Sequence, residues 1–331
     1  MASVVIGFIL CGVAVFTAGI ILSRSADQIG ELTSLGGVWA GLVLLGAATS
    51  IPELVTDVSA VKIHCPDLAA GDLFGSSLTN MLILGLLDLA LARGRMLREA
   101  SFGAAMAAIL AIALNAAGAT LVLLRPQSNF LGIVPWSALL LVIYLTGARL
   151  ICRWENSAEP GASESKLPQA RPRWALIWPI VEFGVGSILV FFAAPAFAGY
   201  AKQLARVTGF GDTFVGTWLL GFTTALPELV TSWAAVRIGA FDLAVSALFG
   251  SSAFNMVIFL PMDLAHQRGS IFASLDPALA VSGFLAVTLM AVGLASLTYR
   301  SERRFAVLQN GSGLLMTLYF LAICLVFACA K

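Results

Sequence analysis

The sequence is poor in charged residues. Only 11% of its 331 residues are charged, 59% are hydrophobic, and the formal net charge is +1. Soluble domains carry roughly 25% charged residues, so this composition excludes a soluble protein. A net charge near zero also leaves no basic surface for nucleic acid. The sequence therefore predicts an integral membrane protein that has the lipid bilayer, and not nucleic acid, as its partner.

Cysteine and histidine are also scarce. The five cysteines are odd in number and form no CxxC pair, and the chain has only two histidines. A disulfide framework needs paired cysteines, and a zinc site needs clustered thiolate or imidazole ligands. We therefore expect neither, and we predict no cofactor. The sequence leaves the oligomeric state open.

Long apolar runs, in contrast, fill the chain. A hydrocarbon core about 30 Å thick takes ~20 apolar residues per helix. The runs are apolar on every face, whereas a β-barrel needs alternating polar and apolar positions. We predict an all-α polytopic membrane protein with ten transmembrane helices. The predicted spans are 2–22, 36–62, 67–92, 101–124, 130–152, 175–198, 211–236, 242–265, 273–297 and 310–330.

A polar segment divides the spans into two sets of five. Residues 153–174 are rich in Pro, Ser and Glu and separate the first half, 1–152, from the second, 175–331. Lys and Arg concentrate in cytoplasmic connections. If both termini lie outside, thirteen of these residues are cytoplasmic and six are not, so we expect this orientation, a cytoplasmic linker, and a plasma or inner membrane location.

The two halves contain an internal repeat. Residues 46–61, GAATSIPELVTDVSAV, match 221–236, GFTTALPELVTSWAAV, at nine of sixteen positions. Residues 67–81, DLAAGDLFGSSLTNM, match 242–256, DLAVSALFGSSAFNM, at ten of fifteen, with the same offset of 175. Five predicted spans separate the copies. Because five is odd, the second copy crosses the membrane in the opposite sense, as in the inverted repeats of secondary transporters.

Each copy places a glutamate at membrane depth after a proline. Glu53 follows Pro52, and Glu228 follows Pro227. A carboxylate facing lipid near the bilayer centre costs roughly 2.5–3.5 kcal/mol or more, so both side chains should face the protein interior. Proline cannot donate to the carbonyl four residues earlier, and a carbonyl freed in this way can line a cavity.

Other oxygen-bearing side chains recur at helical spacing around these glutamates. A Thr precedes each Glu by one turn, and each following helix carries a Ser and an Asn four residues apart. These residues are Thr49, Thr224, Ser76, Asn80, Ser251 and Asn255. An all-oxygen set suits Ca²⁺, Mg²⁺, Mn²⁺ or Na⁺ better than Zn²⁺ or Cu⁺. Competition between cations for shared ligands is a physical basis for antiport.

These motifs carry a family resemblance. TSIPEL with GSSLTN, and TALPEL with GSSAFN, resemble the α-repeats of the calcium:cation antiporter superfamily, especially prokaryotic sodium/calcium exchangers, and place the repeats at 46–81 and 221–256. The resemblance implies Ca²⁺ and Na⁺ as transported inorganic cations. It implies ion ligands at Glu53, Glu228, Thr49, Thr224, Ser50, Ser76, Ser251, Asn80 and Asn255. Two departures are Ala225, where the first copy has Ser50, and Asn255, where some members have Asp.

Other functions stay open. A Ca²⁺/H⁺ exchanger would use the same glutamates as proton carriers. An intramembrane protease would need two Asp or a Ser/His pair at membrane depth, and a scaffold would leave the polar residues at the midplane unexplained. Asp57 is a candidate for an access path, and Asp72 is interpreted as structural. Asp88 and Asp263 are expected to cap helix ends, with a role in an ion vestibule as the alternative.

Overall fold

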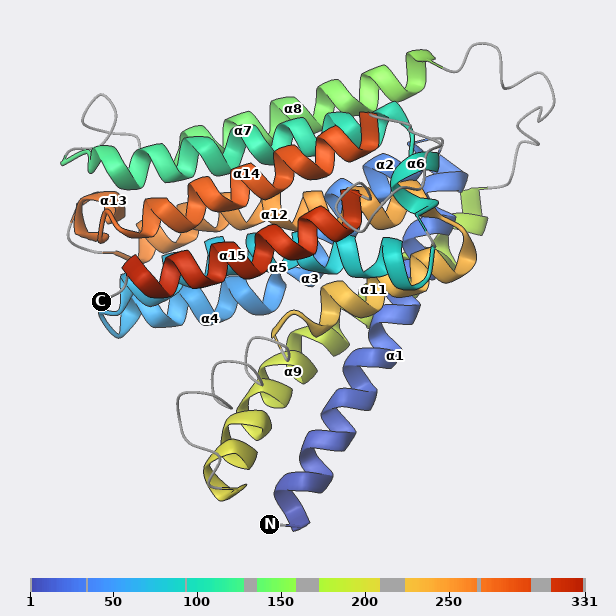
Figure 1. Cartoon of the computed structure of the whole chain (residues 1–331). Helices are drawn as coiled ribbons and strands as arrows, with labels where there is room; N and C mark the ends of the chain where they lie inside the picture. The colour runs from blue at the N-terminus through green and yellow to red at the C-terminus, as the bar shows by residue number, and fades with distance from the viewer. Residues whose placement is uncertain are drawn as a thin grey trace.

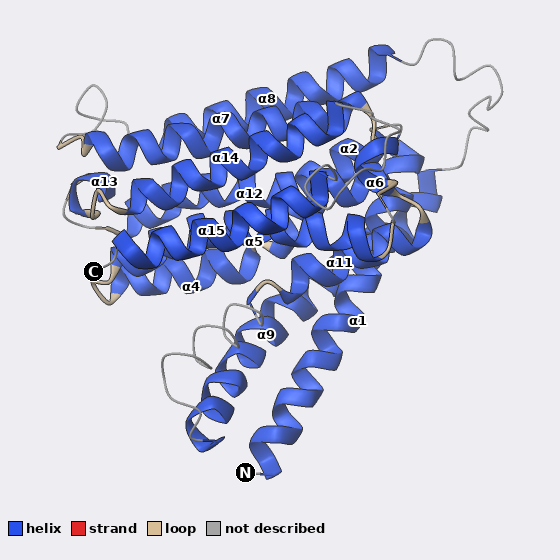
Figure 2. Ribbon diagram, viewed as in Figure 1, coloured by secondary structure: helices blue, strands red, loops and turns tan. Residues whose placement is uncertain are grey.

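Every element of the protein in the described ranges is helical (Figure 2). The computed structural model describes residues 2–33, 35–92, 94–127, 136–158, 173–208, 224–266, 269–298 and 311–329. The first half contains α1 (Ala2–Thr33), α2 (Gly36–Trp39), the π-helix η1 (Ala40–Leu45), α3 (Gly46–Thr49), α4 (Ile51–Lys62), α5 (Pro66–Ala90), α6 (Met96–Glu99), α7 (Phe102–Leu124) and α8 (Ser137–Ala158). The second contains the 3-10 helix η2 (Arg173–Leu176), α9 (Ile177–Thr208), α11 (Leu226–Ile238), α12 (Phe241–Ala265), α13 (Ile271–Ser274), α14 (Leu279–Thr298) and α15 (Gly311–Cys329).

Seven of the described helices are long and apolar enough to cross a membrane. The segment from α2 to α4 adds an eighth if its bent pair of helices is one span, and residues 311–326 of α15 form a shorter apolar helix. These helices confirm an integral membrane protein. The first half of the predicted span at 211–236 lies outside the described residues, and so does the start of the span at 130–152. The count of ten spans therefore stays a prediction.

Two helices continue beyond the apolar runs that were predicted as spans. The first predicted span ends at residue 22, and α1 continues to Thr33 through Arg24, Asp27 and Glu31. Similarly, α9 continues to Thr208, past the expected end at residue 198. Between its two terminal turns, an α-helix satisfies its own backbone hydrogen bonds. It therefore does not have to end where polar side chains begin. The sequence shows only where the apolar run stops, and not where the helix stops.

The fold is organised around α12. This helix packs against α5, α7, α8 and α11 and against the segment from α2 to α4 (Figure 1). Helix α5 also contacts α14 and α15. Helices α1 and α9 lie side by side and extend away from the bundle in Figure 1. The repeated blocks therefore lie in the centre of the molecule, and the apolar first helices of the two halves form an arm.

Two glycines allow the broken helix to cross α12 closely. A Cβ atom on Gly46 would lie 2.6 Å from the carbonyl carbon of Gly250. A Cβ atom on Gly250 would lie 2.5 Å from the carbonyl oxygen of Leu42. Small residues at a helix crossing let the two backbones approach closely. The resulting van der Waals contacts stabilise the crossing, because the hydrophobic effect does not drive helices together in lipid. This crossing brings the polar residues of the first copy against those of the second.

Candidate ion-binding site

Both glutamates lie in the first turn of a new helix. The chain bends by 43° at Ser50, between α3 and α4, and Pro52 and Glu53 follow in the first turn of α4. Pro227 and Glu228 have the same place in α11. Proline suits this position because the first amides of a helix have no partner inside the helix. The partial positive charge of a helix N-terminus also stabilises a carboxylate there.

Hydroxyl and amide groups connect the two copies. The Oγ atoms of Ser50 and Ser251 are 3.0 Å apart, and Ser251 donates to Oε1 of Glu228 over 3.3 Å. The amide of Asn80 donates to Ser251 at 3.3 Å and to Ser252 at 3.1 Å. Four helical segments, α3–α4, α5, α11 and α12, thus meet in one polar network. This network is the junction between the repeated blocks.

Several oxygens at this junction lack partners. Glu53 is 4% exposed and Glu228 is 2% exposed, and the Oε2 atom of each is buried without a hydrogen bond. Oδ1 of Asn255 is also buried without a partner. A buried polar atom without a partner costs about 1–3 kcal/mol, and more when it is charged. These oxygens are therefore available to a bound cation, which would remove that cost.

Asp57 and Asp72 extend the acidic cluster. Asp57 on α4 is 1% exposed, its Oδ2 atom is buried without a hydrogen bond, and Asp72 on α5 acts on it electrostatically. Both act electrostatically on Glu53, and Asp72 acts on Glu228 as well. The repeat comparison missed Asp72 because its counterpart is Ala247. The sequence did contain one indication of its place, since Asp72 lies one helical turn before Ser76 and so shares a face of α5 with it.

Asn115 is a second residue that the repeats did not reveal. It lies on α7, outside the repeated blocks, and its amide donates to the carbonyls of Ser252 and Ala111, each at 3.0 Å. Its Oδ1 atom is buried without a partner. Asn115 thereby holds the backbone of α12 at Ser252, next to Ser251.

The remaining sequence candidates lie around this network. Thr49 donates to the carbonyl of Leu45 at 2.9 Å and interacts with the Glu228 carboxylate. Asn255 donates to the carbonyl of Leu73 on α5 at 3.5 Å. Ser76 is partly buried, one turn before Asn80, and Thr224 is partly buried just before α11. The freed carbonyl expected at residue 223 lies outside the described residues.

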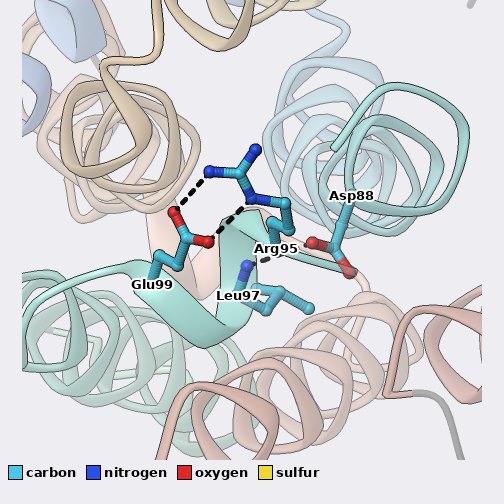
Figure 3. Close-up of polar contacts among 4 residues, drawn as sticks. All are labelled: Asp88, Arg95, Leu97 and Glu99. Atoms are coloured by element: carbon cyan, nitrogen blue, oxygen red, sulfur yellow. Dashed lines mark hydrogen bonds and ion pairs between the residues drawn. The ribbon is translucent and has the colours of Figure 1, made fainter. Parts of the chain in front are cut away.

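Asp88 and Asp263 cap helix ends, as expected. Asp88 accepts a hydrogen bond from the backbone amide of Leu97 in α6 at 3.1 Å (Figure 3). Asp263 accepts one from the amide of Ile271 in α13 at 2.8 Å. Each carboxylate satisfies an amide in the first turn of a short helix, where such groups have no partner within the helix.

The acidic side chains of the site need a positive charge to neutralise them. The charged groups that act on Glu53 are Glu228, Asp72 and Asp57, which are all acidic. An uncompensated buried charge is strongly destabilising. Across the part of the chain that the structure describes, no three His, Cys, Asp or Glu side chains converge closely enough to hold a metal by themselves. A cation would therefore combine carboxylates with hydroxyl, amide and carbonyl oxygens, as Ca²⁺ and Na⁺ do.

Comparison with known proteins assigns the family. The family model described as sodium/calcium exchanger protein matches residues 3–148 and 178–328. The chain belongs to this family. The match covers most of both halves and omits the whole polar linker at 153–174. Because the family consists of exchangers, the chain is a membrane transporter of the cation antiporter class.

Three relatives of this exchanger show how far the likeness extends. Inner membrane protein YrbG of Escherichia coli is 27% identical over 281 residues, which cover 84% of this chain and 82% of YrbG. Sodium/potassium/calcium exchanger 2 of Gallus gallus is 34% identical over 97 residues, which cover 29% of this chain and 15% of that protein. The solved sodium/calcium exchanger of Methanococcus jannaschii is 18% identical with a TM-score of 0.72, covering 98% and 99% of the two chains. That structure supports the fold of the exchanger.

Proposed function

We propose that this protein is a secondary antiporter that exchanges Ca²⁺ for Na⁺ across the membrane around Glu53 and Glu228. One observation carries the proposal: two buried carboxylates, one from each copy of the repeat, meet with partnerless oxygens at one junction. Two carboxylates neutralise one divalent ion. Na⁺ ions can neutralise the same pair when Ca²⁺ leaves, so the two cations compete for shared ligands, and this competition couples their movements.

The neighbouring neutral oxygens complete the proposed coordination. Hard cations take six or more oxygen ligands, including hydroxyl, amide and carbonyl groups. The proposed ligands are Glu53, Glu228, Thr49, Thr224, Ser50, Ser76, Ser251, Asn80 and Asn255. Ala225 removes one hydroxyl from the second copy, and Asn255 contributes an amide where related exchangers can have a carboxylate. We infer that Asp57 and Asp72 supply the additional negative charge of the site.

The proposed mechanism is alternating access between two inverted halves. Residues 1–152 and 175–331 would each supply five spans, and the site would lie near the midplane where they meet. The excess of Lys and Arg in alternate connections favours outside termini and a cytoplasmic linker at 153–174. The name of YrbG favours an inner membrane location.

Exchange of Ca²⁺ for H⁺ is the second candidate, and the grouping of Glu53 with three other acidic side chains favours it. Like charges that lie close together oppose one another's ionisation. When no metal cation is bound, a proton would therefore neutralise part of this acidic group. This proton would leave or enter as the charge in the site changes, which would couple H⁺ to Ca²⁺.

Uptake of ⁴⁵Ca²⁺ into proteoliposomes distinguishes the two couplings. We expect an outward Na⁺ gradient to drive uptake, and a proton ionophore to leave that uptake in place. Uptake driven by an outward H⁺ gradient, without any dependence on Na⁺, would replace the first candidate with the second. Absence of uptake under both gradients, with folded protein in the vesicles, would refute calcium antiport.

A further inference from the structure

Four aspartates lie at the ends of the two central helices. Asp67 and Asp88 lie at the two ends of α5, and Asp242 and Asp263 lie at the two ends of α12. The offset of 175 that relates the repeats aligns Asp67 with Asp242 and Asp88 with Asp263. All four carboxylates accept hydrogen bonds from residues of the opposite half of the chain. The proposed ion ligands on these two helices, Ser76, Asn80, Ser251 and Asn255, lie between them.

The aspartates at the beginning of each helix form one reciprocal pair of contacts. Asp67 on α5 accepts from the backbone amide of Asp276, at 2.8 Å, in the second half. Asp242 on α12 accepts from the backbone amide of Ser101, at 2.6 Å, in the first half. Ser101 and Asp276 are themselves separated by 175 residues. Both the acceptors and the donors therefore correspond between the two copies.

The aspartates at the end of each helix form a second reciprocal pair. The hydroxyl of Ser312, at the start of α15, donates to Oδ2 of Asp88. The hydroxyl of Ser137, at the start of α8, donates to Oδ2 of Asp263 at 2.7 Å. Ser137 and Ser312 also differ by 175, and all four side chains are buried. Chance contacts would not repeat donors and acceptors with one offset, so the arrangement is a property of the duplicated fold.

We propose that these four aspartates are positioning residues, which hold α5 and α12 in axial register and thereby set the geometry of the ion ligands. Asn80 precedes Asp88 by eight residues, and Asn255 precedes Asp263 by eight. At 1.5 Å per residue this is about 12 Å along each helix axis. A slip of either helix would draw Asn80 away from Ser251, with which it shares a hydrogen bond of 3.3 Å. The functional part of this inference rests on the proposed ion-binding role of those ligands.

The first test measures the Ca²⁺ concentration that gives half-maximal uptake in Asp88→Asn and Asp263→Asn. Asparagine keeps the shape but cannot accept both hydrogen bonds as a carboxylate does, and hydrogen bonds to charged groups are worth about 1.5–3 kcal/mol. We expect the half-maximal concentration to rise about fivefold or more, with maximal rate per folded protein less affected. Ser312→Ala and Ser137→Ala should act in the same direction, and each serine variant should add little to its own aspartate variant. Glu99→Gln, an exposed carboxylate near Asp88, is the control and should leave the value unchanged.

The second test does not depend on transport, so it separates this inference from the proposed function. Amide hydrogen exchange in detergent reports whether loss of the Asp88 or Asp263 contact loosens the distant centre of α5 and α12. We expect faster exchange around Asn80 and Asn255 in both aspartate variants. If an aspartate variant fails to fold, the corresponding serine variant replaces it, and we expect a smaller increase in exchange there. Faster exchange confined to the helix ends, with half-maximal Ca²⁺ within twofold of the parent, would show that these residues only cap helices and would overturn the inference.

Discussion

The two copies of the repeat share their helices and end-of-helix contacts, but they differ in the number of acidic side chains. The first carries three acidic side chains at the central junction, Glu53, Asp57 and Asp72, whereas the second carries only Glu228. At the positions that correspond to Asp57 and Asp72, the second copy has Ser232 and Ala247. The framework therefore follows the duplication, while the electrostatics do not. The matched glutamates are expected to be indispensable, and the unmatched polar residues of the site are expected to adjust affinity or coupling.

The largest expected effect comes from the matched glutamates. Glu53→Gln and Glu228→Gln each keep the shape of the side chain but remove one of the two charges that neutralise a divalent ion. Because removing one partner of a buried charge pair costs about 3–5 kcal/mol, we expect Ca²⁺ transport to fall by at least about a hundredfold. Vesicle uptake of ⁴⁵Ca²⁺ checks this, with Glu99→Gln as the control. Near-normal uptake in both glutamine variants would refute the site.

Alanine substitutions at the matched glycines Gly75 and Gly250 should change the stability of the protein in different ways. A Cβ on Gly250 would lie 2.5 Å from the Leu42 carbonyl oxygen, so Gly250→Ala should destabilise the protein by about 1–3 kcal/mol. A Cβ on Gly75 meets no atom within 4 Å in the described structure, so Gly75→Ala should be neutral or stabilising by about 0.5–1 kcal/mol through helix propensity. Thermal unfolding in detergent distinguishes them. Equal losses in both would contradict the closeness of the α12 crossing.

The unmatched aspartates should affect coupling more than folding. Asp57→Asn and Asp72→Asn remove a charge next to Glu53, and we expect an approximately tenfold rise in the half-maximal concentration of the driving cation. The matched control is Ser232→Ala, at the position in the second copy that corresponds to Asp57. If neither aspartate variant alters the dependence on Na⁺ or H⁺, the additional charge of the first copy has no role in transport.

The smallest expected effect concerns the hydroxyl that only the first copy has. Ser50→Ala removes the 3.0 Å contact with Ser251, and a hydrogen bond contributes about 0.5–1.5 kcal/mol. We therefore expect about a fivefold rise in half-maximal Ca²⁺. The reverse change, Ala225→Ser, should leave affinity unchanged or raise it. A larger loss in Ala225→Ser than in Ser50→Ala would contradict the proposed place of this hydroxyl.

The sequence predicted the features that depend on local chemistry or on duplication. The apolar runs indicated helices, the prolines indicated an interrupted hydrogen-bond pattern before each Glu, and the repeats pointed to Glu53 and Glu228 as candidate ligands. The sequence did not predict features that arise only from packing between segments. Asn115 approaches Ser252 across 137 residues, and Asp72 has no counterpart in the second copy. The apolar run that begins the chain ends at residue 22 and α1 ends at Thr33, because a helix can continue through polar side chains while its own backbone bonds stay satisfied.

Equilibrium binding of ⁴⁵Ca²⁺ to the purified protein in detergent tests the central claim most directly. The measurement compares the parent with Glu53→Gln and Glu228→Gln while Na⁺ is raised. We predict saturable binding of Ca²⁺ by the parent, displacement by Na⁺, and loss of binding in both variants when they remain folded. Binding that survives both substitutions would contradict the claim that the paired glutamates of the two copies hold the transported ion.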